Sequence, residues 1–187
     1  MKYKRITDCV SAMFLSALLS APVLANSKGD QERDQDNKGA RDSRVVNAEL
    51  IGYQEVPSVS STCEGQFHAT ISDNNTQIEF ELSYEKLEGN VQQAHIHFGQ
   101  KSVNGGVSIF LCSNLGNAPA GTPSCPGPNS GTVTGTRQAA SVIGGAAAQG
   151  IAAGELEELI EAIQAGKAYA NVHSDKFPTG ECRGQIR

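Results

Sequence analysis

The sequence contains no tryptophan, and aromatic residues make up only 5% of its 187 positions. Large apolar side chains are scarce overall, since the hydrophobic fraction is 39%, whereas there are 20 glycines. Such a composition favours strands, turns and loops over a helical bundle. The length suits one domain of ordinary size and is short for two.

Positive charge is also in short supply. Lysine and arginine number 15 against 20 aspartates and glutamates, which gives a net charge of −5 at pH 7. A general nucleic-acid binder needs a concentrated basic surface to neutralise phosphates. We therefore expect no nucleic-acid partner.

A hydrophobic run long enough to span a membrane is missing near the N-terminus. The apolar stretch 10–20 has about 11 residues, where a spanning helix needs about 20. Lys2, Lys4 and Arg5 precede this stretch, and the small residues of 23–25 follow it, as in a cleaved secretory signal. The pattern predicts a signal peptide over 1–25, a secreted or periplasmic protein and no permanent membrane anchor. Cys9 precedes the apolar core, which argues against a lipoprotein anchor.

A charged segment follows the predicted cleavage site. Ten of the nineteen residues in 26–44 are charged, five of each sign. Such a segment buries too little apolar surface to offset its ordering entropy. We expect a disordered spacer that is dispensable for folding, followed by a single domain over 45–187. Loss of Lys2, Lys4, Arg5 and Asp8 with the signal would change the net charge from −5 to −7.

The predicted domain alternates apolar and polar residues with a period of two, as half-buried antiparallel strands do. Residues 66–71 and 77–84 alternate in this way around the turn sequence 72–75, which predicts a hairpin. Further strands are expected over 45–51, 91–98, 106–111, 131–136, 168–174 and 181–187. Eight short strands with little helix predict a mainly β fold, a Greek-key antiparallel β-sandwich or barrel.

One segment departs from the strand pattern. Leu156, Leu159, Ile160 and Ile163 follow the i, i+3, i+4, i+7 spacing of an amphipathic helix, and Gly166 stands where a C-terminal cap is expected. We expect one short helix there. The stretches 112–131 and 144–154, rich in Gly, Pro, Ala and Ser, are expected to be loops.

Three of the four histidines lie in two predicted strands. Strand alternation places His95 and His97 on the face opposite Ala94, Ile96 and Phe98. The same rule in 168–174 places His173 with Tyr169 and Asn171 on a shared polar face. If the two strands are neighbours, the three imidazoles converge at a spacing that suits copper or zinc. Histidines that only hydrogen-bond neighbouring strands and loops would give the same pattern. The fourth, His68, is expected to be exposed.

Several enzyme classes lack their signatures in this sequence. It contains no Gly-x-Ser-x-Gly elbow, no phosphate-binding loop and no His-Glu-x-x-His. Glu79 and Glu81 share one strand face but suit a solvated surface better than an acid–base pair. No catalytic residue is assigned.

Four cysteines remain after the predicted signal peptide, an even number that indicates disulfides in an exported chain. Cys63 and Cys182 share the core-facing parity of their strands, while Cys112 and Cys125 flank a loop rich in Pro and Gly. Of three pairings we expect Cys63 with Cys182 and Cys112 with Cys125.

Four motifs in order make the chain resemble the CHRD domain, the module first described in chordin. They are AELIGYQEVP at 48–57, AHIH at 94–97, YANVH at 169–173 and GECRGQIR at 180–187. The resemblance runs from about residue 45 to the C-terminus. It implies an extracytoplasmic, immunoglobulin-like β-sandwich and says little about activity. The family's His-x-His and Asn-Val-His motifs fall on His95, His97 and His173, which strengthens the metal hypothesis. Cys182 stands where the family commonly has an aliphatic residue, consistent with an added disulfide to Cys63.

Two functions follow as expectations. The first is a monomeric binding or structural module for an unidentified extracytoplasmic ligand or protein, with one copper or zinc ion held by three histidines. The second is a metal-dependent enzyme of the redox or hydratase type that uses an open position on the same site. The layout also resembles copper-zinc superoxide dismutase, but that two-metal site needs six histidines where this chain has four.

Overall fold

The computed structural model describes residues 44–187, and these form eight antiparallel strands. The strands are β1 (Val45–Ile51), β2 (Glu64–Ile71), β3 (Gln77–Glu85), β4 (Val91–Phe98), β5 (Gly106–Ser113), β6 (Gly131–Gln138), β7 (Ala168–Ser174) and β8 (Cys182–Gln185). The predicted signal peptide and the predicted spacer up to residue 43 lie outside the described residues.

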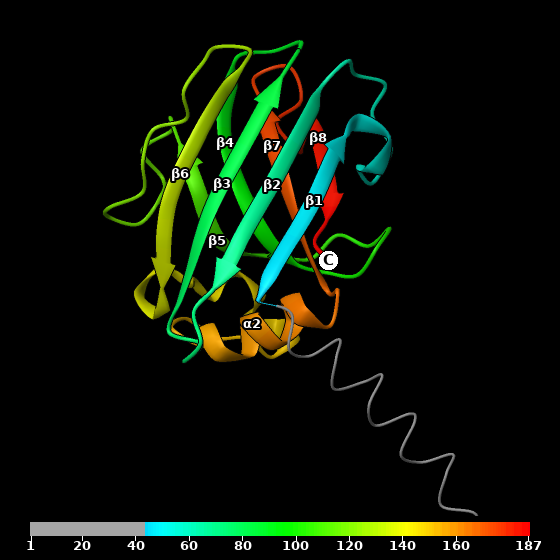
Figure 1. Ribbon diagram of the computed structural model, residues 1–187. Helices are drawn as coiled ribbons and strands as arrows, with labels where there is room; N and C mark the ends of the chain where they lie inside the picture. The colour runs from blue at the N-terminus through cyan, green and yellow to red at the C-terminus, as the bar shows by residue number, and fades with distance from the viewer. Residues whose placement is uncertain (1–43) are drawn as a thin grey trace, which may run out of the picture.

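The strands follow the order β5-β4-β7-β8-β1-β2-β3-β6 in one nearly closed sheet that folds into two layers. Figure 1 shows β1, β2, β3 and β6 in the near layer and β4, β5, β7 and β8 behind them. At one edge the layers are joined because β1 pairs with β8. Just beyond β8, Arg187 forms two further backbone hydrogen bonds with Asn47 of β1, of 2.8 and 2.9 Å. At the other edge Arg137 of β6 donates to the carbonyls of Phe110 and Leu111 in β5 at 2.9 and 2.8 Å. The predicted mainly β, antiparallel sandwich is confirmed.

Strand alternation explains which residues fill the space between the layers. In β3 the side chains of Ile78, Phe80, Leu82 and Tyr84 are buried while the intervening polar residues are mostly exposed. β2 pairs with β3 in register from Ile71 opposite Ile78, so the predicted hairpin is present. Burying one face of each strand removes apolar surface from water and fixes the register, because a shift by one residue would expose the apolar set.

Most of the helical structure lies between β6 and β7, and one short turn lies between β1 and β2. The helix α2 (Leu156–Gln164) buries the predicted apolar stripe, and Gly166 follows with a φ of +66°, which only glycine adopts without strain. Three 3₁₀ turns are η1 (Gly52–Gln54), η2 (Ala139–Ser141) and η3 (Gly144–Gln149). The expectation of a loop throughout 144–154 is therefore wrong at η3, where the buried Ala146 packs into the core. The start of the predicted loop 112–131 likewise belongs to β5.

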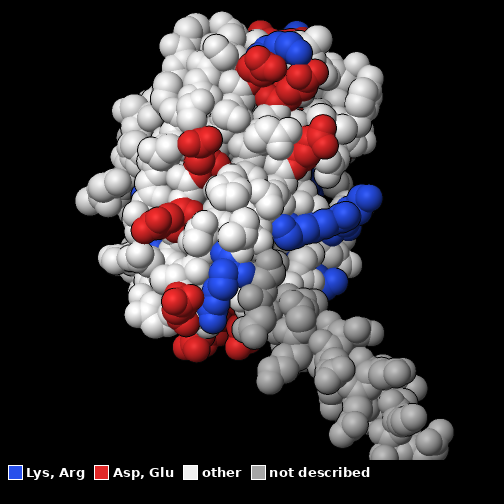
Figure 2. Space-filling view, in the orientation of Figure 1, with Lys and Arg blue, Asp and Glu red and all other residues white. Residues whose placement is uncertain are grey.

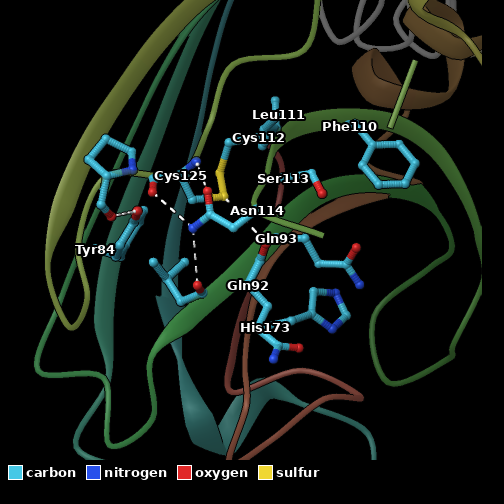
Figure 3. The surroundings of a disulfide bond; sticks show 12 residues. Tyr84, Gln92, Gln93, Phe110, Leu111, Cys112, Ser113, Asn114, Cys125 and His173 are labelled. Atoms are coloured by element: carbon cyan, nitrogen blue, oxygen red, sulfur yellow. Dashed lines mark hydrogen bonds between the residues drawn. A yellow bond between two sulfur atoms is a disulfide. The ribbon is translucent and has the colours of Figure 1, made fainter. Parts of the chain in front are cut away.

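Both predicted disulfides are formed. Cys63 lies just before β2 and Cys182 begins β8, so this bond links the two layers. Cys112 and Cys125 close the loop that follows β5, and Asn114 holds this loop through both of its amide atoms (Figure 3). Both bonds fit the oxidising compartment that the cysteine count predicts.

The face made by β1, β2, β3 and β6 carries scattered charge. In Figure 2 the acidic side chains stand apart or beside basic ones, and this view shows no continuous basic surface. Among residues 44–187, no helix is long and apolar enough to cross a membrane.

Candidate metal centre

The three histidines come together because β4 and β7 are neighbours. In the antiparallel pair His95 lies opposite Asn171 and His97 lies opposite Tyr169. His173 lies opposite Gln93, two residue pairs beyond His95 and on the same face. β4 also shifts register against β5 just before His95 and again just before His97. Register shifts of this kind re-aim side chains. The sheet thus displays the three imidazoles on its face opposite the core.

One ring nitrogen from each histidine lies within 4.8 Å of one from every other. The polar face that carries them is covered, however, since His95, His97 and His173 are only 2%, 7% and 6% exposed. Segments after β4 and after β7 reach over the rings, and their carbonyl groups contact two of them. The cluster is an enclosed site rather than a surface patch.

Backbone carbonyls fix the proton positions on two of the rings. Nδ1 of His97 lies 3.0 Å from the carbonyl oxygen of Gly105, and Nδ1 of His173 lies 3.0 Å from that of Pro178. A carbonyl oxygen only accepts hydrogen bonds, so each Nδ1 carries the proton and donates it. Each Nε2 therefore presents a lone pair to the centre of the cluster, the arrangement that metal-binding histidines use.

Ring nitrogens in the cluster lack hydrogen-bond partners. Nε2 of His95 and Nε2 of His97 are buried and unpartnered within residues 44–187. Nδ1 of His95 lies 3.1 Å from Nε2 of His173, which is a hydrogen-bonding distance with the unprotonated Nε2 as the acceptor. Leaving buried acceptors unpaired costs free energy, which a cation bound to the lone pairs would offset. The residues present thus fit a zinc or copper ion.

Burial keeps the three imidazoles neutral. Desolvation, with the neighbouring histidines as a smaller cause, lowers the pKa of His95 to about 2. Desolvation also lowers the pKa of His97 to about 4 and lowers the pKa of His173, in both cases against a backbone hydrogen bond that raises it. Neutral rings are the form that binds metals. Protons therefore compete with a metal for the folded site only well below pH 6.5, the ordinary pKa of an imidazole.

Aromatic rings support the cluster from two sides. His97 stacks on Tyr169 with ring centroids 4.7 Å apart, and the guanidinium carbon of Arg183 lies 3.4 Å from the other face of Tyr169. The rings of His95 and Phe110 meet edge to face, with their centroids 4.4 Å apart. These contacts restrict the tilt of both imidazoles.

A buried carboxylate borders the cluster. Glu55, which follows η1, is 6% exposed, and burial raises its pKa to about 7 although Arg183 and a hydrogen bond with Asn171 oppose that shift. A Cβ at Gly180 would collide with this carboxylate, so the backbone approaches closely only because residue 180 is glycine. Glu55 and Arg183 also line a cleft of about 450 Å³ whose rim includes the exposed Tyr53.

Sequence reasoning gave no role to Glu55 or Arg183. Both fall inside the motif stretches at 48–57 and 180–187, which is the one sequence signal that marks them. Tyr169 and Asn171 lie opposite His97 and His95 in the neighbouring strand. His68 lies apart from the cluster on β2, exposed, with Nδ1 2.7 Å from Oδ1 of Asn47.

Comparison with known families agrees with the motifs. The family model of the CHRD domain matches residues 46–186, which is nearly all of the described chain. No curated protein matches the sequence. The chain belongs to the CHRD domain family.

Proposed function

We propose that this CHRD domain is an exported module that binds one copper or zinc ion through His95, His97 and His173. The observation that carries the proposal is the convergence of their ring nitrogens, with two Nε2 atoms buried and unpartnered. Histidines that served only as hydrogen-bonding groups would have both nitrogens satisfied, because unpaired buried acceptors are costly. Here the carbonyls of Gly105 and Pro178 satisfy the outer nitrogens of His97 and His173, which leaves a lone pair on each inner nitrogen.

The site favours a binding module over the metal-dependent enzyme. Catalysis at a metal needs a coordination position that substrate reaches. The three imidazoles are at most 7% exposed and covered by neighbouring segments. Imidazole suits both metals, and copper(II) binds a given nitrogen site more tightly than zinc.

Export is part of the same proposal. The basic n-region and short apolar core of residues 1–25 support a signal peptide, and the two disulfides support an oxidising destination. The destination is the periplasm or the exterior, and the protein acts there as a monomer without a nucleic-acid partner.

Calorimetric titration tests the metal site. Wild-type protein should take up one Cu²⁺ or Zn²⁺ ion per chain at micromolar concentration near pH 7.5. His95→Ala, His97→Ala and His173→Ala should each lose most of the affinity, since each removes one of three ligands. His68→Ala is the matched control, because His68 is exposed and paired with Asn47, and it should titrate like wild type.

Two results would overturn the proposal. One is a wild-type protein that takes up neither metal in this concentration range. The other is a set of single variants whose effects are small and independent, which would show that the histidines do not share an ion.

A further inference from the structure

We propose that the segment 175–179, between β7 and β8, is the gate through which the ion enters and leaves the three-histidine site. The gate rests on the proposed metal site and concerns its exchange with solvent. The three imidazoles are at most 7% exposed, so a covering segment has to move before an ion can pass. Two segments contact the rings, 99–105 through the carbonyl of Gly105 and 175–179 through that of Pro178. Figure 1 shows 175–179 in the orange-red loop that joins β7 to β8.

The segment 99–105 is fastened by a buried cation. The guanidinium of Arg183 donates to the carbonyls of Gln100 and Val103 at 3.2 and 2.9 Å. It also donates to Oδ1 of Asn104 at 3.2 Å. Arg183 is only 2% exposed, so opening this segment would leave a buried charge without these partners, at a high cost in free energy. An ion therefore does not leave on this side.

The segment 175–179 is fastened by exposed groups. The carboxylate of Asp175 accepts two hydrogen bonds of 2.8 Å, from the backbone and from the side chain of Asn90. The backbone N–H of Asp175 donates to the carbonyl of Asn90 at 3.0 Å, and Lys176 pairs with Glu88. All four residues are exposed, so water can replace their partners when the segment moves. Exposed pairs of this kind contribute little to stability, and segments held by them open first.

The ends of the gate are fixed while its middle is exposed. Ser174 and Gly180 flank it and are both buried. Gly180 has a φ of +131°, a conformation that glycine adopts readily and that suits a hinge. The local hydrogen bonds of Phe177 run to these two residues, so the turn can move as one unit. Its hydrogen bond to the cluster is the one that the carbonyl of Pro178 accepts from Nδ1 of His173.

Opening the gate has a definite effect on metal exchange. It removes the Pro178 carbonyl from Nδ1 of His173, the contact that fixes the tautomer of this ligand. The closed state therefore holds the ion, and the open state lets it pass. Because the closed state dominates, a variant that opens more often should gain the same factor in the rates of entry and release. Its dissociation constant should stay unchanged.

Proton exchange of the imidazoles tests the gate in the metal-free protein. The Nδ1 proton of His173 meets solvent when 175–179 opens, whereas that of His97 is held by Gly105 of the other segment. In NMR spectra near pH 7.5 the His173 proton should exchange at least about tenfold faster than the His97 proton. Faster exchange at His97 would overturn the gate.

Stopped-flow mixing measures the entry of Zn²⁺ and its release to excess EDTA. Asp175→Ala removes the acceptor of both Asn90 bonds and should accelerate entry and release about 5- to 10-fold, with the dissociation constant within about twofold of wild type. Asn90→Ala removes only the side-chain bond and should give a smaller acceleration. Thermal unfolding of each metal-free variant shows that it is folded before mixing.

Asn104→Ala is the matched control on the other segment. It also removes two side-chain hydrogen bonds, to the carbonyl of Val56 at 2.8 Å and from Arg183 at 3.2 Å. Both exchange rates of this variant should equal those of wild type, because 99–105 does not open to pass the ion.

The outcomes separate the gate from the proposed function. Unchanged rates in Asp175→Ala, or an equal acceleration in Asn104→Ala, overturn the gate and leave the three-histidine site standing. Absence of metal binding in wild type overturns the three-histidine site and with it the passage of an ion. The order of imidazole proton exchange then still decides whether 175–179 is the segment that opens.

Discussion

The imidazole of His97 lies almost parallel to the phenol ring of Tyr169, with an angle of 6° between the planes. Tyr169 also accepts a hydrogen bond of 3.3 Å from the backbone N–H of Gly105, whose carbonyl accepts the Nδ1 proton of His97. One tyrosine thus sets both the plane of the imidazole and the loop that fixes its tautomer. Arg183 covers the opposite face of Tyr169 and completes the stack.

Two substitutions of Tyr169 should distinguish the contribution of its ring to stability from that of its hydroxyl group. Tyr169→Phe keeps the stack and removes one acceptor, so we expect a loss of about 1 kcal/mol in the free energy of unfolding. Tyr169→Ala removes the buried ring and should cost about 3 to 5 kcal/mol. Urea unfolding of the metal-free proteins measures both values. Equal losses for the two variants would show that the stack contributes nothing.

The buried histidines should make the metal-free protein sensitive to acid. The folded pKa of His95 and of His97 lies below the ordinary value of 6.5, so below that pH the unfolded chain binds more protons than the folded one. Stability is therefore full above pH 6.5 and falls as the pH drops toward 4. Each group contributes up to about 1.4 kcal/mol per pH unit. Urea unfolding at pH values from 7 to 4.5 measures how steeply the free energy of unfolding falls with pH. The His68→Ala variant should show the same slope as wild type, and the His97→Gln variant should show a smaller one.

The contribution of Glu55 to stability should change with pH in the opposite direction. Burial raises its folded pKa to about 7 from 4.5, so the folded chain holds the proton more tightly and stability falls as the pH rises from 4.5 through 7. Glu55→Gln removes the ionisable group and should gain up to about 3 kcal/mol over wild type at pH 8, and little at pH 4.5. A difference between the two proteins that does not change with pH would contradict a buried, titrating Glu55.

The two disulfides should differ in their contribution to stability. In the chain-entropy model, the Cys63–Cys182 bond spans 119 positions and is worth about 4 to 5 kcal/mol, whereas the Cys112–Cys125 bond spans 13 and is worth about 3 kcal/mol. Peptide mapping of unreduced protein should recover these two pairs. Double Ala variants of each pair, compared by urea unfolding, give the order of the losses, and a larger loss for the shorter loop would contradict the model.

Local patterns were enough to predict the strands and the faces of the histidines. The alternation in β3 and the helical spacing of Leu156 and Leu159 each depend on residues close in sequence, and the structure agrees with both. The 3₁₀ turn η3 escaped prediction because it is short and because its two glycines disfavour a helix, against the preference of the three alanines that follow. Its position depends on packing of Ala146 against the core.

The residues that surround the histidines could not be predicted from the sequence. Strand parity placed His95 and His97 on one face, but their distance from His173 depends on which strands are neighbours, and β4 and β7 are far apart in the chain. Glu55 reaches the site through a segment outside the strands, so no periodicity marks it. Parity also could not show that chain segments cover this polar face.

The most direct test of the metal centre is a long-range ¹H–¹⁵N NMR spectrum of the imidazoles before and after addition of one equivalent of Zn²⁺. The ion should shift the Nε2 resonances of His97 and His173 and one ring nitrogen of His95. The Nδ1 protons of His97 and His173 should persist, because the carbonyls of Gly105 and Pro178 hold them. The resonances of His68 should not move. Unchanged Nε2 resonances, or shifts at His68 equal to those of the cluster, would contradict a three-histidine metal site.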